Sequence, residues 1–340
     1  MNAIPKFLPA DFASNQEVRW CPGCGDYSIL KSVQRTLSEI GADPAKTVCI
    51  SGIGCSSRFP YYVETYGYHT IHGRAPAIAT GVKLGNPSLD VWIVTGDGDG
   101  LAIGGNHMLH LLRRNLDCQV LLFNNEIYGL TKGQCSPTSR FGACSPSTPF
   151  GSVDRPINPC AFALGAGARF VARSYDFALN KTPAILSRAH AHRGASFVEI
   201  YQNCIAYNDG AFEKFAGKKA AADAQLWLEM GKPMLFANGA KGLRLDRKTL
   251  ALEVVAVADQ DPEAAGILVH DETNKVIAQL LIEMPFGSFP VAFGVIYCDP
   301  APAFDNVVIE QNRKLAASKK RDLKALLCKG DTWLIEATHA

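Results

Sequence analysis

Two short apolar segments joined by an amphipathic one constrain the fold of this chain more than any other feature. Residues 91–95 and 120–123 are apolar and partly β-branched, which is typical of buried strands. Residues 102–115, between them, have the length and apolar spacing of a helix that connects parallel strands. We therefore expect a βαβ unit, and with it the α/β fold class.

Each of these strands is followed by a polar loop. Gly96-Asp97-Gly98-Asp99 follows the first strand and Asn124-Asn125 follows the second. In a parallel sheet such loops gather at one edge, where ligands bind, so Asp97 and Asn125 are expected to face one pocket. Two side-chain oxygens, with a backbone carbonyl and a diphosphate, suit Mg²⁺, and the glycines let the backbone approach phosphates closely.

Two further strands are expected to bring cysteines to the same edge of the sheet. Residues 47–50 precede the loop 51–56, which contains Cys55, and residues 197–200 precede Gln202-Asn203-Cys204. If all four strands are parallel and adjacent, both cysteines lie near the pocket.

A helix is expected near the N-terminus, over residues 26–40. Its apolar residues fall on one stripe, Asp26 can cap its first turn, and Gly41 can end it.

The eleven cysteines are an odd number and a high one, which favours metal ligands or buried thiols over a disulfide framework. Cys21 and Cys24 form a C-x₂-C pair, and Cys55 and Cys204 complete a possible set of four. A thioredoxin-like pair is disfavoured because residues 14–19 are polar and do not predict a strand. Four thiolates suit either zinc or a 4Fe–4S cluster, and the residues alone leave both open.

Composition narrows the class of protein further. A chain of 340 residues with 47% hydrophobic content can bury a large core, as one large domain with a smaller one appended. The 34 Lys and Arg residues nearly balance the 32 Asp and Glu residues, so neither nucleic acid nor an anionic membrane is indicated. No stretch approaches the roughly 18 apolar residues of a membrane span and no signal peptide is evident, which predicts a cytoplasmic protein.

Six sequence blocks in order resemble one family, the β subunits of the 2-oxoacid:ferredoxin oxidoreductases, and most closely their 2-oxoglutarate branch. The resemblance implies an α/β thiamine-diphosphate-binding fold, with a mostly parallel sheet, helices on both faces and a smaller mixed C-terminal extension. It divides the chain into a cofactor and cluster domain, 1–210, and an extension, 211–340. The blocks are residues 20–30, 51–62, 69–87, 96–107, 124–139 and 157–174.

The resemblance also implies ligands for three groups. Mg²⁺ would be held by Asp97, Asn125 and the carbonyl of Ile127. One 4Fe–4S cluster would be held by Cys21, Cys24, Cys55 and Cys204. Thiamine diphosphate would be lined by Ile53, Gly54, Cys55, Ser56, Gly98, Asp99, Gly129 and Leu130.

Three side chains are candidates for catalysis. Leu130 fits a prop that bends the cofactor, with an ordinary core leucine as the alternative. Arg58 could bind a substrate carboxylate bidentately, or could merely be positioned by the loop of Cys55. His72 could shuttle protons or bind phosphate, or could be structural.

The function implied is CoA-dependent, reversible oxidative decarboxylation of 2-oxoglutarate to succinyl-CoA and CO₂, with electrons passing through the cluster to ferredoxin. A separate α subunit would supply the pyrimidine-binding domain and the catalytic glutamate, in a dimer of αβ heterodimers. Residues 211–340 leave no room for such a domain and instead predict helices near 220–230, 274–284 and 308–321 and a strand at 266–270.

Three alternatives compete with this function. The first is a β subunit specific for pyruvate or for a broad range of 2-oxoacids. The second is a zinc-stapled interaction subunit without catalysis, which would leave the GDGD and NN loops unexplained. The third is a non-oxidative thiamine enzyme, which needs no cluster and therefore no set of four cysteines.

Overall fold

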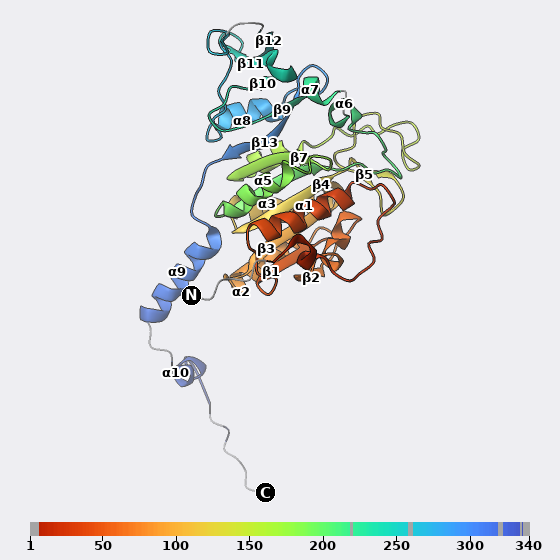
Figure 1. The fold of residues 1–340 in the computed structure, drawn as a ribbon. Coiled ribbons are helices and arrows are strands. Elements are labelled where there is room, and N and C mark those ends of the chain that lie inside the picture. Colours follow the sequence, from red (N-terminus) through yellow and green to blue (C-terminus); the bar gives the residue numbers. More distant parts are fainter. Residues whose placement is uncertain (1–6, 218–219, 258–260, 319–321, 334, 336–340) are drawn as a thin grey trace.

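An eight-stranded sheet forms the centre of the molecule (Figure 1). The computed structural model describes residues 7–333 and 335, apart from 218–219, 258–260 and 319–321. The first six strands in spatial order are parallel, and β13 runs antiparallel to β7 and parallel to β9. The spatial order is β2 (Tyr66–His69), β1 (Thr47–Ser51), β3 (Asp90–Gly96), β4 (Cys118–Asn124), β8 (Ala195–Tyr201), β7 (Phe170–Tyr175), β13 (Val291–Cys298) and β9 (Gln225–Trp227).

This architecture confirms the predicted α/β fold with a mostly parallel sheet. The four strands expected from the sequence correspond to β3, β4, β1 and β8. Gly96 pairs with Phe123, and Asn124 pairs with Tyr201, so three neighbouring strands end at one level. The loops that follow them therefore emerge together.

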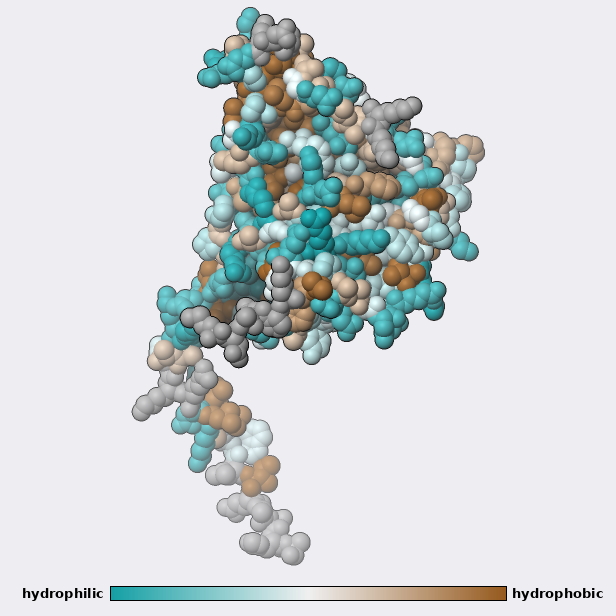
Figure 2. Space-filling view, in the orientation of Figure 1, coloured by the Kyte–Doolittle hydropathy of each residue, from teal (hydrophilic) through white to brown (hydrophobic). Residues whose placement is uncertain are grey.

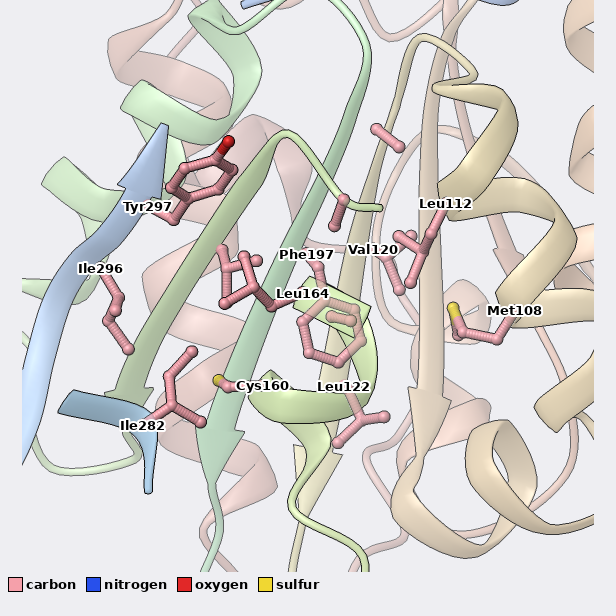
Figure 3. Packing of buried hydrophobic residues seen from close by; sticks show 14 of the residues in the cluster. Met108, Leu112, Val120, Leu122, Cys160, Leu164, Phe197, Ile282, Ile296 and Tyr297 are labelled. Carbon is pink, nitrogen blue, oxygen red and sulfur yellow. The ribbon is translucent and has the colours of Figure 1, made fainter. Parts of the chain in front are cut away.

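Helices cover both faces of the sheet, and each face has its own apolar core. On one face, α2 (Ala75–Gly85), α3 (Gly105–Arg114), α4 (Pro159–Gly165) and α8 (Lys275–Ile282) pack on strand residues such as Val120 and Leu122. On the other, α1 (Asp26–Glu39) and α5 (Thr182–Ala191) pack on Leu121 and Phe123. The alternation along β4 is the period of two that a strand imposes. Figure 3 shows the first core, in which Met108 of α3 belongs to the same cluster as Val120 and Leu122 of β4.

The crossover predicted over 102–115 begins earlier than expected and is not one regular helix. A π-helical turn, η3 (Asp99–Ile103), precedes α3, and Gly104 separates the two. A β-carbon on Gly104 would lie 2.4 Å from the carbonyl oxygen of Asp99, so the wide turn needs glycine here. Such turns are frequent at functional sites.

The predicted cap of the first helix is wrong, although its end is confirmed. Gly25 is the N-cap residue of α1, and Asp26 is already helical, with a carboxylate that accepts no hydrogen bond from the backbone N–H groups of the first turn. A β-carbon on Gly25 would lie 2.0 Å from Oδ2 of Asp176, so the N-cap position needs glycine, and Asp26 beside it is fully buried. Gly41 ends the helix with a φ of 67°.

The C-terminal part contributes to the central sheet and also forms a small sheet of its own. Strands β10 (Leu235–Phe236), β11 (Lys241–Asp246) and β12 (Ala251–Ala256) are antiparallel. Both β9 and β13 lie beyond residue 210, yet they extend the main sheet, and the predicted division into two domains stays a prediction.

Two expectations for this part are confirmed and two are not. Helix α8 matches the helix predicted at 274–284, and α9 (Phe304–Ser318) matches most of 308–321, whose residues 319–321 lie outside the described ones. The strand expected at 266–270 is only an isolated bridge between Val269 and Pro233. The helix expected at 220–230 is one short turn, α7 (Ala221–Ala224), because Leu226 is fully buried in β9.

Helices α9 and α10 (Leu323–Leu327) extend away from the body of the molecule (Figure 1). They carry exposed leucines, visible as apolar patches in Figure 2. Within the described residues, no helix is both long and apolar enough to cross a membrane.

Candidate functional site

A cavity of about 450 Å³ lies where β1, β3 and β4 end. Asp97, Asn125, Ile127 and His72 line it, together with Tyr128. It also brings together every residue that the sequence predicted around thiamine diphosphate. These residues are Ile53, Gly54, Cys55, Ser56, Gly98, Asp99, Gly129 and Leu130.

Asp97 is buried at the end of β3, and its two carboxylate oxygens have different environments. The hydroxyls of Ser136 and Thr138 donate to Oδ2 over 2.6 and 2.5 Å. No side chain in the described part of the chain donates to Oδ1, which leaves that oxygen available for a metal ion. Burial raises the pKa of the Asp97 carboxyl to about 6, and the two hydroxyls oppose that rise.

The hydroxyls around Asp97 belong to a segment to which the sequence analysis gave no role. Thr138 Oγ1 also lies 3.0 Å from Oδ1 of Asn124, and Ser139 Oγ donates to the carbonyl of Glu126 over 2.5 Å. Residues 136–139 therefore join the loop after β3 to the loop after β4. The three hydroxyl side chains in the sequence Ser-Pro-Thr-Ser were the one feature that could have indicated this role.

Asn125 is held in a tight turn. Its Oδ1 accepts the backbone N–H of Ile127 over 3.1 Å, and Glu126 between them has a φ of 56°. Its amide nitrogen donates to Oε1 of Gln202 over 2.9 Å. An amide oxygen has two lone pairs, so Oδ1 can still bind a metal ion.

Asp99 also lines the cavity, but its carboxylate is fully engaged by the chain itself. It accepts hydrogen bonds from the backbone of Ile53 (3.0 Å) and Gly73 (2.7 Å), and from Oγ1 of Thr95 (2.6 Å). Nδ1 of His72 lies 2.6 Å from the same carboxylate. This contact fits the structural alternative for His72, although the ring still faces the cavity, and the role of His72 stays a prediction.

Close packing at Gly98 shapes the cavity wall. The Tyr128 hydroxyl donates to the carbonyl of Gly98 over 3.1 Å, and a β-carbon on Gly98 would lie 2.1 Å from the tyrosine ring. Leu130 is 49% exposed, so the alternative of an ordinary core leucine is wrong, while its role as a prop stays a prediction.

A second cavity, of about 230 Å³, is lined by the four predicted cluster cysteines, Cys21, Cys24, Cys55 and Cys204. It shares Cys55, Asn125, Gly129 and Leu130 with the first cavity. A β-carbon on Gly129 would lie 3.5 Å from the sulfur atoms of both Cys55 and Cys204. The expected closeness of these two cysteines to the cofactor pocket is therefore found.

Arg58 lies in the second cavity and not in the first. Its Nε donates to the hydroxyl of Tyr62 over 3.2 Å. The structure thus does not bring Arg58 together with Asp97, and its binding of a substrate carboxylate stays a prediction.

In the second cavity, burial disfavours the negatively charged thiolate form of three cysteines. Burial raises the pKa of the Cys24 and Cys204 thiols and raises that of Cys55 to about 12. Bound metal would supply the charge that favours thiolates. Across the described residues, no three His, Cys, Asp or Glu side chains converge closely enough to hold a single metal ion.

The fold and the first cavity define a thiamine-diphosphate-binding protein, and comparison with known families agrees. Residues 52–200 match the family described as thiamine pyrophosphate enzyme, C-terminal TPP binding domain. This segment contains both loops that carry the predicted Mg²⁺ ligands.

Individual relatives narrow the class. The chain is 47% identical to the 2-oxoglutarate oxidoreductase subunit KorB of Mycobacterium tuberculosis, over 96% of this chain and 88% of the relative. It is 49% identical to 2-oxoacid:ferredoxin oxidoreductase 1, subunit beta, of Aeropyrum pernix, over 56% of this chain and only 60% of that relative.

A solved structure matches nearly the whole chain. It is the 2-oxoglutarate:ferredoxin oxidoreductase from Magnetococcus marinus with 2-oxoglutarate, coenzyme A and succinyl-CoA bound. The TM-score is 0.78 at 31% identity, covering 97% of this chain and 98% of the other. The chain belongs to the β subunits of the 2-oxoacid:ferredoxin oxidoreductases.

Proposed function

We propose that this chain is the β subunit of a 2-oxoglutarate:ferredoxin oxidoreductase. With its α subunit it catalyses the CoA-dependent oxidative decarboxylation of 2-oxoglutarate to succinyl-CoA and CO₂. The observation that carries this function is the shared wall between a cavity with Mg²⁺-type ligands and a cavity lined by four thiols.

The residues of the first cavity fit thiamine diphosphate and Mg²⁺. Asp97 would bind the ion through Oδ1, since Oδ2 is already occupied by two hydroxyls. Asn125 and the Ile127 carbonyl would complete the protein ligands. Gly98 lets the backbone reach the diphosphate, and Leu130 presents an apolar side chain beside it.

The residues of the second cavity fit a 4Fe–4S cluster better than zinc. A single zinc ion needs four sulfur atoms that converge on one point, about 2.3 Å away. The four thiols instead surround a cavity, and no three of them meet in that way. In a 4Fe–4S cluster the four cysteine ligands surround a group of several atoms, so their sulfur atoms need not converge on one point.

When bound, the thiamine supplies the electron sink for decarboxylation and the cluster accepts the electrons. The chain's own contribution is to hold the two groups against one wall, made by Cys55, Asn125, Gly129 and Leu130. Asp97 is buried together with Ser136 and Thr138, whose hydroxyls hold it, which limits the access of water to this carboxylate.

The relatives support the substrate and the partners. The M. tuberculosis relative is named for 2-oxoglutarate, and the M. marinus structure contains 2-oxoglutarate and coenzyme A. A β subunit implies an α subunit, which would carry the pyrimidine-binding domain and the catalytic glutamate. We further propose a dimer of αβ heterodimers with ferredoxin as acceptor. None of the eleven cysteines, all of which lie in the described part of the chain, is joined in a disulfide, which suits the reducing cytoplasm that we propose for the protein.

Anaerobic purification of the αβ complex tests the proposal. We expect about four iron and four sulfide per β subunit, no stoichiometric zinc, and bound thiamine diphosphate. A panel of 2-oxoacids with CoA and ferredoxin should give the highest kcat/KM for 2-oxoglutarate. A higher kcat/KM for pyruvate, or equal values across the panel, would show that 2-oxoglutarate is not the preferred substrate. A complex that contains zinc and no iron would refute the electron-transfer role.

A further inference from the structure

Gln202 lines the second cavity, directly after β8 and two residues before Cys204. Its side chain is 1% exposed. Its backbone N–H donates to the carbonyl of Asn124 over 2.9 Å, which fixes the residue to the end of β4.

The amide of Gln202 contacts one predicted ligand of each group. Oε1 accepts from Nδ2 of Asn125 over 2.9 Å. Nε2 donates one proton to the carbonyl of Asn203 (2.5 Å) and one toward the sulfur of Cys24 (3.3 Å). Both hydrogens of the amide are therefore used, and a buried amide left unpaired is costly.

The orientation of this amide is determined by its neighbours. The carbonyl of Asn203 can only accept, so it requires the nitrogen of Gln202 on its side. The N–H of Ile127 requires the oxygen of Asn125, which turns the Asn125 nitrogen toward Gln202. A directed series of hydrogen bonds therefore runs from Ile127 through Asn125 and Gln202 to Cys24.

We propose that Gln202 is a positioning residue that serves both groups: it holds Asn125 in its metal-binding orientation and donates to the Cys24 sulfur, raising the cluster's reduction potential. The inference rests on the proposed function, because it takes Asn125 and Cys24 as ligands. An N–H donor stabilises the more negative, reduced cluster, and hydrogen bonds to the sulfurs are a known control of cluster potential. The effect is stronger in a buried site of low dielectric.

Two substitutions separate the two contacts in the anaerobic αβ complex. Gln202→Leu removes both. Gln202→Glu keeps an acceptor for Asn125 but replaces the donor to Cys24 with a carboxylate, whose negative charge by itself lowers the midpoint potential, so Gln202→Leu is the variant that isolates the lost donor. The measurements are the midpoint potential of the cluster, by EPR-monitored titration, and the Mg²⁺ concentration at which half of the thiamine diphosphate is retained.

We expect both variants to have a more negative midpoint potential than the wild type. Gln202→Leu should also need about 10-fold more Mg²⁺, the usual effect of losing an outer-shell partner. Gln202→Glu should stay within about twofold of the wild type for Mg²⁺. A purely structural role would not split the two readouts in this way.

The control is Gln225→Leu, which also removes a buried amide that both donates and accepts a hydrogen bond, in β9 and in the lining of neither cavity. It should leave the potential and the Mg²⁺ requirement unchanged. An unchanged midpoint in Gln202→Glu, or in Gln202→Leu, would overturn the inference. A wild-type complex without iron or without thiamine diphosphate would instead overturn the proposed function.

Discussion

Replacing Asp97 with alanine removes the buried carboxylate that accepts hydrogen bonds from the hydroxyls of Ser136 and Thr138. We expect Asp97→Ala to lose thiamine diphosphate, because the diphosphate and Mg²⁺ lose their common anchor. The fold should survive, since the residue follows β3 and lies outside both apolar cores. Cofactor content after gel filtration, beside a circular dichroism spectrum, is the measurement. A wild-type cofactor content would remove Asp97 from the ligands.

A second change at this scale addresses the cluster. Cys204→Ser should lose the cluster or make it labile to oxygen, and ferredoxin reduction should fall with it, because serine lacks the thiolate ligand. Thiamine diphosphate should still bind, since Cys204 does not line the first cavity. Iron content and ferredoxin reduction are the measurements.

The control for this change is Cys160→Ser. Cys160 is fully buried in α4 and donates to Glu199, at a distance from the four-thiol cavity. Its iron content should equal that of the wild type. Iron loss in Cys160→Ser, or full iron in Cys204→Ser, would contradict the assigned ligand set.

The sequence predicted the residues that touch the site better than the residues that hold it. Asp97, Asn125 and the four cysteines could be found because their residue types and loop positions suit metals. Thr138 and Gln202 could not, because hydroxyls and amides are common and their partners lie far away in the chain. Asp26 was misassigned for a related reason, since its environment depends on Asp176, which is 150 residues away in sequence.

At the scale of elements, apolar runs in the sequence predicted the central strands well, whereas tertiary contacts determined the elements that were predicted wrongly. Residues 91–95 and 120–123 are buried on both faces, as their continuous apolar runs require. Leu226 and Trp227 read as helical in sequence, yet they pair with Ala292 and Phe293 in β13, and local propensity cannot anticipate such pairing.

His270 connects a loop to β13 and provides a test that depends on pH. Its Nε2 donates to the carbonyl of Val295 over 2.8 Å, and burial lowers the pKa of the ring below its ordinary value of 6.5. An unfolded histidine therefore takes up a proton before the folded one does. Its contribution to the free energy of unfolding falls as pH drops below 6.5, by up to about 1.4 kcal/mol per pH unit.

The variant His270→Gln isolates this contribution, because glutamine can donate to the same carbonyl and does not titrate. Buried acids such as Glu126, whose pKa burial raises to about 7, act in the opposite direction, so only the difference between the two proteins is informative. Urea unfolding from pH 7.5 to 5.5 should show the wild type losing stability relative to the variant. If the free energies of unfolding of the two proteins changed in parallel with pH, the lowered pKa of His270 would be refuted.

At the scale of the whole molecule, the main sheet crosses the boundary predicted at residue 210. Strand β13 covers the edge of β7, and Phe293 is fully buried against Tyr201 and Trp227. We expect a truncated chain of residues 1–210 to lack cooperative unfolding, because both the edge strand and part of each core would be exposed. Thermal unfolding followed by circular dichroism is the measurement. A sharp transition would instead establish 1–210 as an independent domain.

The wall that the two cavities share limits how the protein can be altered, in evolution or by design. Cys55, Asn125, Gly129 and Leu130 each line both cavities, so one substitution there changes two chemical environments together. Ser56 faces only the first cavity and Arg58 only the second. Substitutions that change one reaction step without the other are therefore confined to residues that line a single cavity. The residues of the shared wall should vary least among descendants of this sequence.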